Sequence, residues 1–298
     1  MNDLGLVTGA EAANPLQQTL FGAEAERAAD PQPDLAALAP VYRAAMADLG
    51  IRQPQETYLP DLILPLVRFF RQRIPATRAP FLIGLAGGPG AGKTTLSRLL
   101  ARCLAAAMLP TPDCLSLSID DFYHPREERL RRGFTWRTLP GTHDTGRIGQ
   151  FIAALDRPGI APLTVPRYDL GRDAPMDEET LTGRPDICIF DGAMVGSPLP
   201  GYDRLAKRID FLIFLDLPPA LLKQWRFERE RKLREASGGA VGFSEDQMQA
   251  FWDEALGPSI EKWVAPNAHR ADLVLSMDAD RRVTAAQRPQ LCRTGTPE

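Results

Sequence analysis

The chain has 298 residues, of which 44% are hydrophobic and 24% charged, which is ordinary usage for a globular protein. This composition excludes a fibrous protein and a fully disordered one. The 35 Lys and Arg nearly balance the 38 Asp and Glu, and the net charge is −3. We therefore expect no nucleic-acid partner and no polybasic membrane anchor.

Cysteine usage and apolar patterning predict a soluble cytoplasmic protein. The four cysteines lie far apart without a CxxC pair, which is typical of free thiols in a reducing compartment and gives no structural zinc set. The first residues lack the basic and apolar regions of a secretory signal, and no apolar run is long and unbroken enough to span a bilayer. We expect no membrane partner.

The N-terminal part of the chain predicts an arm followed by helices. Residues 1–33 are rich in Ala, Gln, Glu and Pro and predict a flexible arm, whose removal we expect to be harmless. Residues 34–76 predict a helical extension. Its first helix has apolar residues at helical spacing between Asp34, a typical N-cap, and Gly50, a typical C-terminal stop. A second helix is expected over 62–74.

One α/β domain is expected over 77–280. Five short apolar runs alternate with helical stretches, which predicts a mostly parallel five-stranded sheet between two layers of helices. The runs cover 81–87, 114–120, 186–192, 210–217 and 271–277. Residues of about 124–185 are rich in Pro, Gly, Arg and Asp and predict an irregular binding insert, while 281–298 predict a flexible tail.

The most specific motif follows the first of these strands. Its sequence, GGPGAGKT, matches the phosphate-binding pattern GxxxxGK(S/T) and stands between a strand and a helix, as that pattern requires. Glycines let successive backbone N–H groups point at phosphate oxygens, the lysine adds a positive charge, and the threonine hydroxyl binds Mg²⁺. The motif predicts a P-loop NTPase fold. The residues that we expect to bind ATP with Mg²⁺ are Gly87, Gly88, Pro89, Gly90, Ala91, Gly92, Lys93, Thr94 and Thr95.

Three classes of P-loop protein are open at this point: a small-molecule kinase, a switch GTPase, and an ATPase motor or transporter subunit. The sequence contains neither the guanine-reading NKxD nor the transporter LSGGQ, which disfavours the last two. A kinase needs a carboxylate that takes the proton of the acceptor hydroxyl, near the P-loop at the carboxyl end of a strand. Asp120 fits this base, and Asp121 beside it fits a substrate contact. Asp191, at the end of the third strand, fits the Mg²⁺ site, although each carboxylate could instead cap a turn.

Arginines are dense on a predicted helix in QWRFERERKLR, and we interpret residues of about 222–243 as a lid over the triphosphate. Arg226 and Arg229 would neutralise phosphate charge during transfer, since guanidinium groups match phosphate oxygens. The interleaved glutamates leave open a solvated helix with Glu–Arg pairs.

Six segments in order, GGPGAGKTTLS, SIDDFY, LPGTHD, VPRYD, FDG and QWRFERERKLR, carry a family resemblance. From about Phe81 to Met277 the chain resembles the D-glycerate 3-kinase branch of the P-loop kinases, which also include pantothenate kinase, uridine kinase and phosphoribulokinase. The resemblance implies transfer of the ATP γ-phosphate to the 3-hydroxyl of D-glycerate, with Asp120 as the general base. The third strand of that branch commonly ends Phe-Glu-Gly-Trp, whereas this chain has Asp191 and Ala193 there, which leaves the acceptor open.

A glycerate-like acceptor carries a carboxylate, so its pocket needs a fixed cation. We assign this role first to Arg167 and second to Arg137. The other candidates are His143 and Asp144, for acceptor hydroxyls, and Tyr123 and Tyr168, as pocket walls; structural hydrogen bonding or packing is open for each. The sequence thus predicts an ATP-dependent small-molecule kinase, with D-glycerate as the first acceptor. The alternatives are a related kinase for a nucleoside, pantothenate or another hydroxy acid, and a nucleotide-dependent switch that phosphorylates no small molecule.

Overall fold

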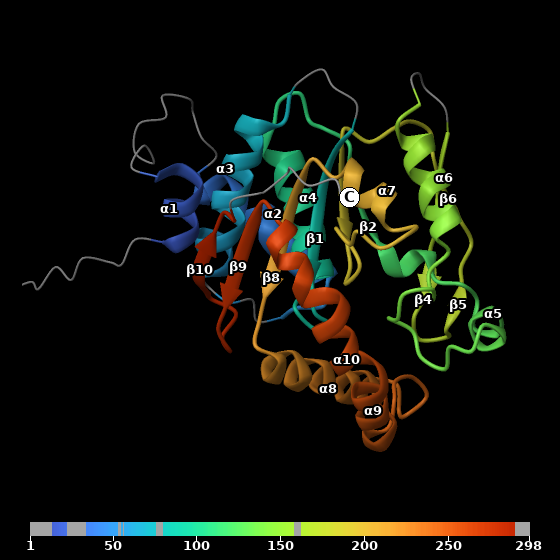
Figure 1. Ribbon diagram of the computed structural model, residues 1–298. Helices are drawn as coiled ribbons and strands as arrows, with labels where there is room; N and C mark the ends of the chain where they lie inside the picture. The colour runs from blue at the N-terminus through green and yellow to red at the C-terminus, as the bar shows by residue number, and fades with distance from the viewer. Residues whose placement is uncertain are drawn as a thin grey trace, which may run out of the picture.

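The structure is a computed structural model that describes residues 14–22, 34–52, 55, 57–75, 80–157 and 162–289. In these ranges a central sheet has the strand order β10-β9-β8-β1-β7-β2 (Figure 1), and all neighbouring pairs except β10–β9 are parallel. The predicted α/β fold with a mostly parallel sheet is confirmed. The five runs that the sequence indicated form β1 (Phe81–Gly87), β2 (Cys114–Ser118), β7 (Ile187–Asp191), β8 (Phe211–Asp216) and β9 (Leu273–Met277).

The sheet has a sixth strand, β10 (Val283–Gln287), which corrects the prediction of a flexible tail over 281–298. This strand pairs antiparallel with β9 at one edge of the sheet. Its sequence, VTAAQ, is only weakly apolar, so it carries little strand signal of its own, and its hydrogen bonds depend on the neighbour that it meets. Residues 290–298 lie outside the described residues.

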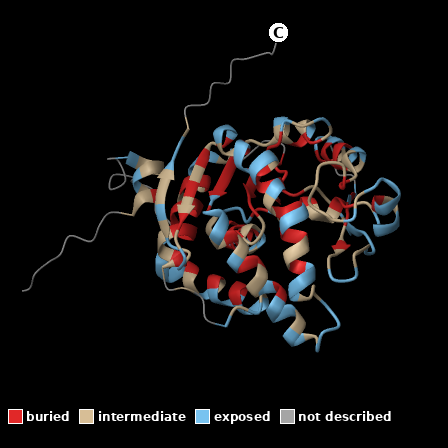
Figure 2. Cartoon of the chain, turned by 60° about the horizontal axis from the view of Figure 1, so that its bottom comes forward, coloured by how far each residue is buried: buried red, intermediate tan, exposed pale blue. Residues whose placement is uncertain are grey.

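Helices cover both faces of the sheet, which is the middle layer of a three-layer sandwich (Figure 1). Alternate strand residues join different cores, as Ile83 and Leu82 of β1 do, because successive side chains of a strand point to opposite faces. Helices α2 (Leu35–Asp48), α3 (Leu64–Arg73) and α4 (Lys93–Ala107) pack on one face, and α6 (Thr145–Leu155) and α7 (Asp203–Arg208) on the other. Figure 2 shows the buried residues concentrated on the strands and on the helix faces that meet them.

Helix α1 (Pro15–Phe21) corrects the prediction of a flexible arm over 1–33 for the part that is described. Asn14 caps the helix, and its Nδ2 donates to the backbone oxygen of Asp61 at 3.0 Å. Leu16 is fully buried, and the Thr19 hydroxyl donates to the Ala286 carbonyl of β10 at 2.9 Å. The helix therefore covers the edge strand of the sheet. Residues 1–13 and 23–33 lie outside the described residues.

Leu16→Ala is expected to lower the free energy of unfolding by about 2–5 kcal/mol, because it empties a fully buried site between α1 and the rest of the fold. Thermal or urea unfolding measures this loss. Gln18→Ala, on the exposed side of the same helix, is the matched control and should change the stability by no more than about 0.5 kcal/mol. Equal stabilities for the two variants would mean that α1 does not contribute to the folded domain.

The insert over 124–185 contains more regular structure than the sequence indicated. It holds helix α5 (Arg126–Arg131), helix α6 and two small antiparallel sheets. One pairs β3 (Leu163–Val165) with β6 (Glu179–Leu181), and the other pairs β4 (Tyr168–Asp169) with β5 (Ala174–Pro175).

The remaining elements are helical. They are the π-helical turn η2 (Leu59–Ile63) before α3, the 3-10 turn η3 (Ile119–Phe122) after β2, the long helix α8 (Pro219–Ala236), and a run of α9 (Glu245–Phe251), η4 (Trp252–Leu256), α10 (Gly257–Ser259), η5 (Ile260–Val264) and η6 (Ala265–Arg270). Among the described helices, none combines the length and the hydropathy needed to cross a membrane.

Candidate active site

The phosphate-binding motif forms a tight loop between β1 and α4. Gly87, Gly90 and Gly92 have φ angles of 145°, 85° and 86°, in the region that favours glycine. Helix α4 begins at Lys93, so its first N–H groups face the loop. The Lys93 Nζ donates to the Gly88 carbonyl at 2.8 Å. This arrangement fits the phosphates of a bound nucleotide.

Helix α8 lies directly against this loop, at the end of the sheet where β8 leads into it (Figure 1). A Cβ atom at Gly88 would lie 2.3 Å from Leu222 Cδ1, and one at Gly90 would lie 3.3 Å from the backbone nitrogen of Arg226. The glycines are therefore needed for the packing of α8 as well as for the approach of phosphate. The motif pattern alone does not reveal this second requirement.

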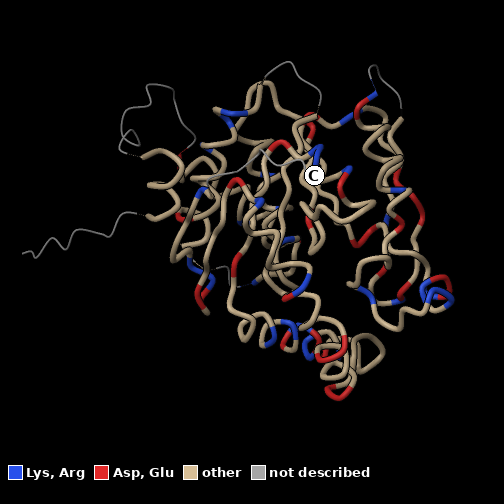
Figure 3. The backbone as a smooth tube through the Cα atoms, viewed as in Figure 1, with Lys and Arg blue, Asp and Glu red and all other residues tan. Residues whose placement is uncertain are grey.

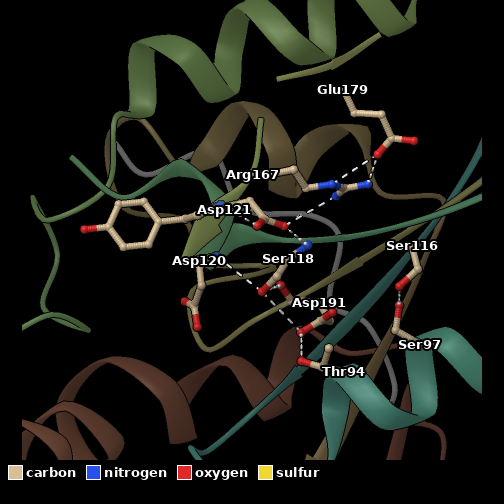
Figure 4. Close-up of polar contacts among 10 residues, drawn as sticks. Thr94, Ser97, Ser116, Ser118, Asp120, Asp121, Arg167, Glu179 and Asp191 are labelled. Carbon is tan, nitrogen blue, oxygen red and sulfur yellow. Dashed lines mark hydrogen bonds and ion pairs between the residues drawn. The ribbon is translucent and has the colours of Figure 1, made fainter. Parts of the chain in front are cut away.

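Asp191 is a buried carboxylate with one unpartnered oxygen. It ends β7, and its Oδ1 accepts the Thr94 hydroxyl at 2.8 Å (Figure 4). Its Oδ2 has no hydrogen-bond partner among the described residues, although Asp191 is 2% exposed. Burial raises the pKa of Asp191 to about 6, against the Thr94 hydrogen bond and the Lys93 charge, which lower it. These groups fit a hydrated Mg²⁺, with Thr94 as a direct ligand and Asp191 acting through water.

The two carboxylates after β2 point to different sides of turn η3 (Figure 4). Asp121 accepts the backbone N–H groups of Ser118 and Tyr168, both at 3.1 Å, and so ties the end of β2 to strand β4 of the insert. Burial raises the pKa of Asp121. With its oxygens engaged by the backbone, Asp121 holds the insert in place, and its assignment to a substrate contact stays a prediction.

Asp120 is the freer of the two carboxylates, with 38% of its side chain exposed. Burial alone would raise the pKa of Asp120, but the neighbouring His143 and the charge of Lys93 hold it below its usual value. An ionised, accessible carboxylate beside the phosphate-binding lysine is placed as a general base would be.

The lid arginines take different positions on α8. Arg226 is buried in an ion pair with Glu230, whose other oxygen accepts the Phe243 N–H at 3.0 Å. Burial lowers the pKa of Lys93, as does the charge of Arg229, while Asp191 and Asp120 oppose this. The charge of Arg229 is thus felt at Lys93.

On its outer face, helix α8 carries solvated pairs of acidic and basic residues, which is the alternative that the sequence left open. Lys232 pairs with Glu228 at 2.6 Å there, and Figure 3 shows basic and acidic residues interleaved along α8.

The two arginines proposed for the acceptor carboxylate differ in how far they are engaged. Arg167 pairs with Glu179 at 2.6 Å and lies 3.7 Å from Asp121, so acidic partners already neutralise it (Figure 4). Arg137 donates to the Leu170 carbonyl at 2.8 Å and to Asp173 at 3.1 Å, with 13% of its side chain exposed. Asp173 also pairs with Arg129, so two arginines share this one carboxylate and a net positive charge remains.

The charge of Arg137 acts on groups near the proposed base and on the lid helix. Burial raises the pKa of Tyr123, next to Asp120, and the charge of Arg137 opposes that shift. Burial also lowers the pKa of Arg226, and Arg137 adds to that lowering. The charge of Arg137 is therefore felt both at Tyr123, beside the proposed base, and at Arg226 of the lid.

Two other predicted pocket residues have structural partners. Asp144 caps α6 by accepting the Arg147 N–H at 2.9 Å, and the Tyr168 hydroxyl donates to Asp173 at 2.9 Å. His143 is 3% exposed and stacks on Tyr123 with ring centroids 4.2 Å apart.

Sequence reasoning missed several residues around the site. Arg129, which is 2% exposed, pairs with Asp173 at 2.5 Å. Trp136 stacks on Phe251 with ring centroids 4.9 Å apart, and its Nε1–H donates to Glu254 at 2.7 Å, which joins the insert to the helices beyond the lid.

Two further residues near the site were missed. The Arg281 guanidinium lies 3.9 Å from the centre of the Trp225 ring, beside the P-loop. The Tyr202 hydroxyl forms a hydrogen bond with His143. Each lies far in sequence from its partner, so no local pattern marks it.

Comparison with known proteins places this site in a family. Residues 82–284 match the Phosphoribulokinase / Uridine kinase family. A pantothenate kinase from Streptomyces coelicolor is 32% identical over 261 residues, which cover 75% of this chain and 79% of the relative. One from Nocardioides sp. is 30% identical over 226 residues, which cover 69% of this chain and 68% of the relative.

A solved structure extends the likeness in fold. The D-glycerate 3-kinase from Cryptococcus neoformans var. grubii superposes with a TM-score of 0.55 at 17% identity, over 84% of this chain and 97% of that chain. At this identity the likeness is one of fold, so the D-glycerate 3-kinase branch stays a prediction. The wider resemblance to the P-loop kinases is confirmed, and the chain belongs to the Phosphoribulokinase / Uridine kinase family of phosphotransferases.

Proposed function

We propose that the chain phosphorylates a hydroxyl group of a small, carboxylate-bearing acceptor with ATP, and that pantothenate is that acceptor. The observation that carries the kinase chemistry is the pair of carboxylates beside the P-loop. Asp191 accepts the Thr94 hydroxyl at 2.8 Å and lies opposite Ser118, two residues before Asp120. Both carboxylates act electrostatically on Lys93. The choice of pantothenate draws on the pantothenate kinases that are 30–32% identical to this chain. Arg137 supplies a cation for its carboxylate.

D-glycerate is the second candidate acceptor. The residues that favour it are RTLPGTHD, from Arg137 to Asp144, which resemble the glycerate kinase group. D-glycerate carries the same carboxylate as pantothenate on a much smaller skeleton, so the same arginine serves both candidates.

The transfer proceeds in line. The acceptor oxygen attacks the γ-phosphorus, its bond to phosphorus forms as the bond to the β–γ bridging oxygen breaks, and ADP leaves with that oxygen. Asp120 takes the proton of the acceptor hydroxyl. Lys93 and Arg229 stabilise the charge on the transferring group. A bound Mg²⁺, held by Thr94 and through water by Asp191, would add charge neutralisation between the β- and γ-phosphates.

The deciding experiment couples ADP release to a panel of acceptors, namely pantothenate, D-glycerate, L-glycerate, uridine and ribulose 5-phosphate. Stimulation by pantothenate with a kcat/KM at least tenfold above the others supports the proposal. Stimulation by D-glycerate alone establishes the second candidate. Binding of ATP with no acceptor-dependent turnover would overturn both and favour a nucleotide-dependent switch.

Arg137→Lys is expected to raise the acceptor KM by about 10–100-fold and to leave the ATP KM within about twofold, because lysine keeps the charge but lacks the planar fork that pairs with a carboxylate. Steady-state kinetics with each substrate varied in turn measure the split. Arg167→Lys is the matched control, since Glu179 and Asp121 already occupy its guanidinium, and should raise the acceptor KM less. The reverse order would move the carboxylate site to Arg167.

A further inference from the structure

A buried chain of polar groups lies behind Asp120. The Tyr202 hydroxyl and the Nδ1 atom of His143 are 2.8 Å apart. The other ring nitrogen, Nε2, is buried, has no hydrogen-bond partner in the described part of the chain, and lies 3.7 Å from Asp120 Oδ1. The imidazole thus stands between a tyrosine, which contacts one nitrogen, and the proposed base, which the other nitrogen faces.

The fold fixes the plane of this imidazole. Tyr123 and His143 oppose each other in an isolated β-bridge, which is flanked by a hydrogen bond from the His124 N–H to the Thr142 carbonyl at 3.0 Å. Opposed residues of a bridge project to the same side, and the two rings stack with an interplanar angle of 18°. The Tyr202 ring meets the imidazole edge-on, at 86°. The imidazole is therefore held from two directions.

The direction of the Tyr202 hydrogen bond sets the tautomer. Burial raises the pKa of Tyr202 to about 12, so the hydroxyl keeps its proton at neutral pH. The nearby backbone N–H groups of Gly141 and His143 lower that pKa without reversing the effect of burial. Among the described residues, the hydrogen bond that the Tyr202 hydroxyl makes is the one to Nδ1, so we take its O–H as the donor there. An imidazole that accepts at Nδ1 carries its proton on Nε2. That N–H faces Asp120.

We propose that His143 is the positioning residue of the base: held by Tyr202 as the Nε2–H tautomer, it donates to Asp120 and keeps that carboxylate ionised and turned toward the acceptor hydroxyl. The 3.7 Å gap is longer than a hydrogen bond, and catalytic hydrogen bonds commonly tighten when substrate binds. This role rests on the proposed function only in taking Asp120 as the base. It differs from the assignment of His143 to an acceptor hydroxyl.

Other titratable groups face this pair from the surrounding elements, and they enter any pH profile. They are Lys93 of α4, Asp191 of β7, Asp121 of η3, Tyr123 and His124 after η3, and Asp144 before α6. The variants below leave all of them in place.

The kinetic test removes the donor and then restores it. His143→Leu should lower kcat by about 10–100-fold, with both KM values within about threefold. Removing a donor to the ionised carboxylate raises its pKa, so the acid limb of the kcat profile should move to higher pH by about one unit. His143→Gln, whose amide can reach the Nε2 position, should recover most of kcat and return the limb. A role in binding the acceptor would instead raise the acceptor KM and leave the limb in place, which would overturn the proposal.

The tautomer is tested without any acceptor. The chain has three histidines, so ¹⁵N-histidine labelling gives three imidazole spin systems, and the His143→Gln variant assigns one of them. At pH 8 the His143 ring should carry its proton on Nε2, and Asp120→Asn should shift that N–H resonance. A proton on Nδ1 would overturn the proposal. Because this spectrum needs no turnover, it separates failure of the proposed function from failure of this inference.

Tyr202→Phe should remove the hydrogen bond that fixes the His143 tautomer, and it should therefore lower kcat. Its matched control is Tyr42→Phe, which removes another buried tyrosine hydroxyl from helix α2, one that bonds none of the residues that the structure describes. Tyr42→Phe should leave the His143 spectrum and kcat unchanged. Equal kcat losses in the two variants would show that the loss is a general effect of tyrosine removal and would contradict a positioning role.

Discussion

Asp120→Asn is expected to lower kcat by about 10²–10⁴-fold, the range for loss of a general base, and to leave ATP affinity within about twofold. The asparagine has nearly the same shape but cannot take the proton of the acceptor hydroxyl. The nucleotide contacts should survive, because Lys93 is anchored to the Gly88 carbonyl rather than to Asp120. Coupled ADP release gives kcat, and titration with a non-hydrolysable ATP analogue gives the affinity.

The control for this variant is the neighbouring carboxylate. Asp121→Asn changes the same charge one residue away, but Asp121 accepts the backbone N–H groups of Ser118 and Tyr168. It should lower stability by about 1–3 kcal/mol, and kcat much less than Asp120→Asn does. If the Asp120 variant turned over at the wild-type rate, Asp120 would not be the base. A larger loss in the Asp121 variant would shift the search to the other side of turn η3.

The residues of the site that sequence predicts best are those placed by strand ends. In a parallel sheet the carboxyl ends of the strands lie at one edge, so the loop after β1, Asp120 after β2 and Asp191 in β7 had to lie at the same edge. The register places them near one another, with Ser118 opposite Asp191 and Leu85 opposite Asp191 on the other side. The type of strand pairing predicts the shared edge, whereas the closeness of these residues depends on the strand order, in which β7 lies between β1 and β2.

Other parts of the site depend on contacts that no local pattern encodes. Gly88 must remain small because Leu222 of α8 lies over it, and the two residues are distant in sequence. Arg167 stands in a loop that looks suited to a carboxylate, yet Glu179 on a separate strand takes its charge. The sequence shows how many cations are present but not which of them already have partners, because pairing is decided by tertiary structure.

The dependence on tertiary contacts also explains why the sequence did not predict the two elements at the ends of the described chain. Helix α1 and strand β10 are short and weakly patterned, and neither would be stable alone. Each covers the other: Thr19 of α1 bonds the Ala286 carbonyl of β10, and β10 in turn pairs with β9. Composition favoured flexibility for both segments, and packing against the edge of a preformed sheet reversed that expectation.

Asp191→Asn is expected to stabilise the metal-free protein at pH 8 by roughly 3 kcal/mol, while it lowers activity by about 10–100-fold. Burial raises the pKa of Asp191 from 3.8 to about 6. The folded protein therefore favours the protonated side chain, and this contribution to stability is full below about pH 4 and is lost as the pH rises through 6. The stability gained by the variant should grow from pH 4 to 7 and then level off, as thermal unfolding in EDTA at several pH values will show.

Adding Mg²⁺ with a non-hydrolysable ATP analogue should make the wild type more stable than the Asp191→Asn variant. The unpartnered Oδ2 of Asp191 then faces the hydrated ion, so the wild type gains more binding stabilisation than the variant. Asp216→Asn is the matched control, since Asp216 ends parallel strand β8 at the same edge of the sheet but is exposed, and it should show neither the pH-dependent gain nor the reversal. Two outcomes separate the possibilities. A gain with no reversal would mean that Asp191 is a buried charge without a metal role, whereas a reversal with no gain would mean that water already solvates its carboxylate in the free protein.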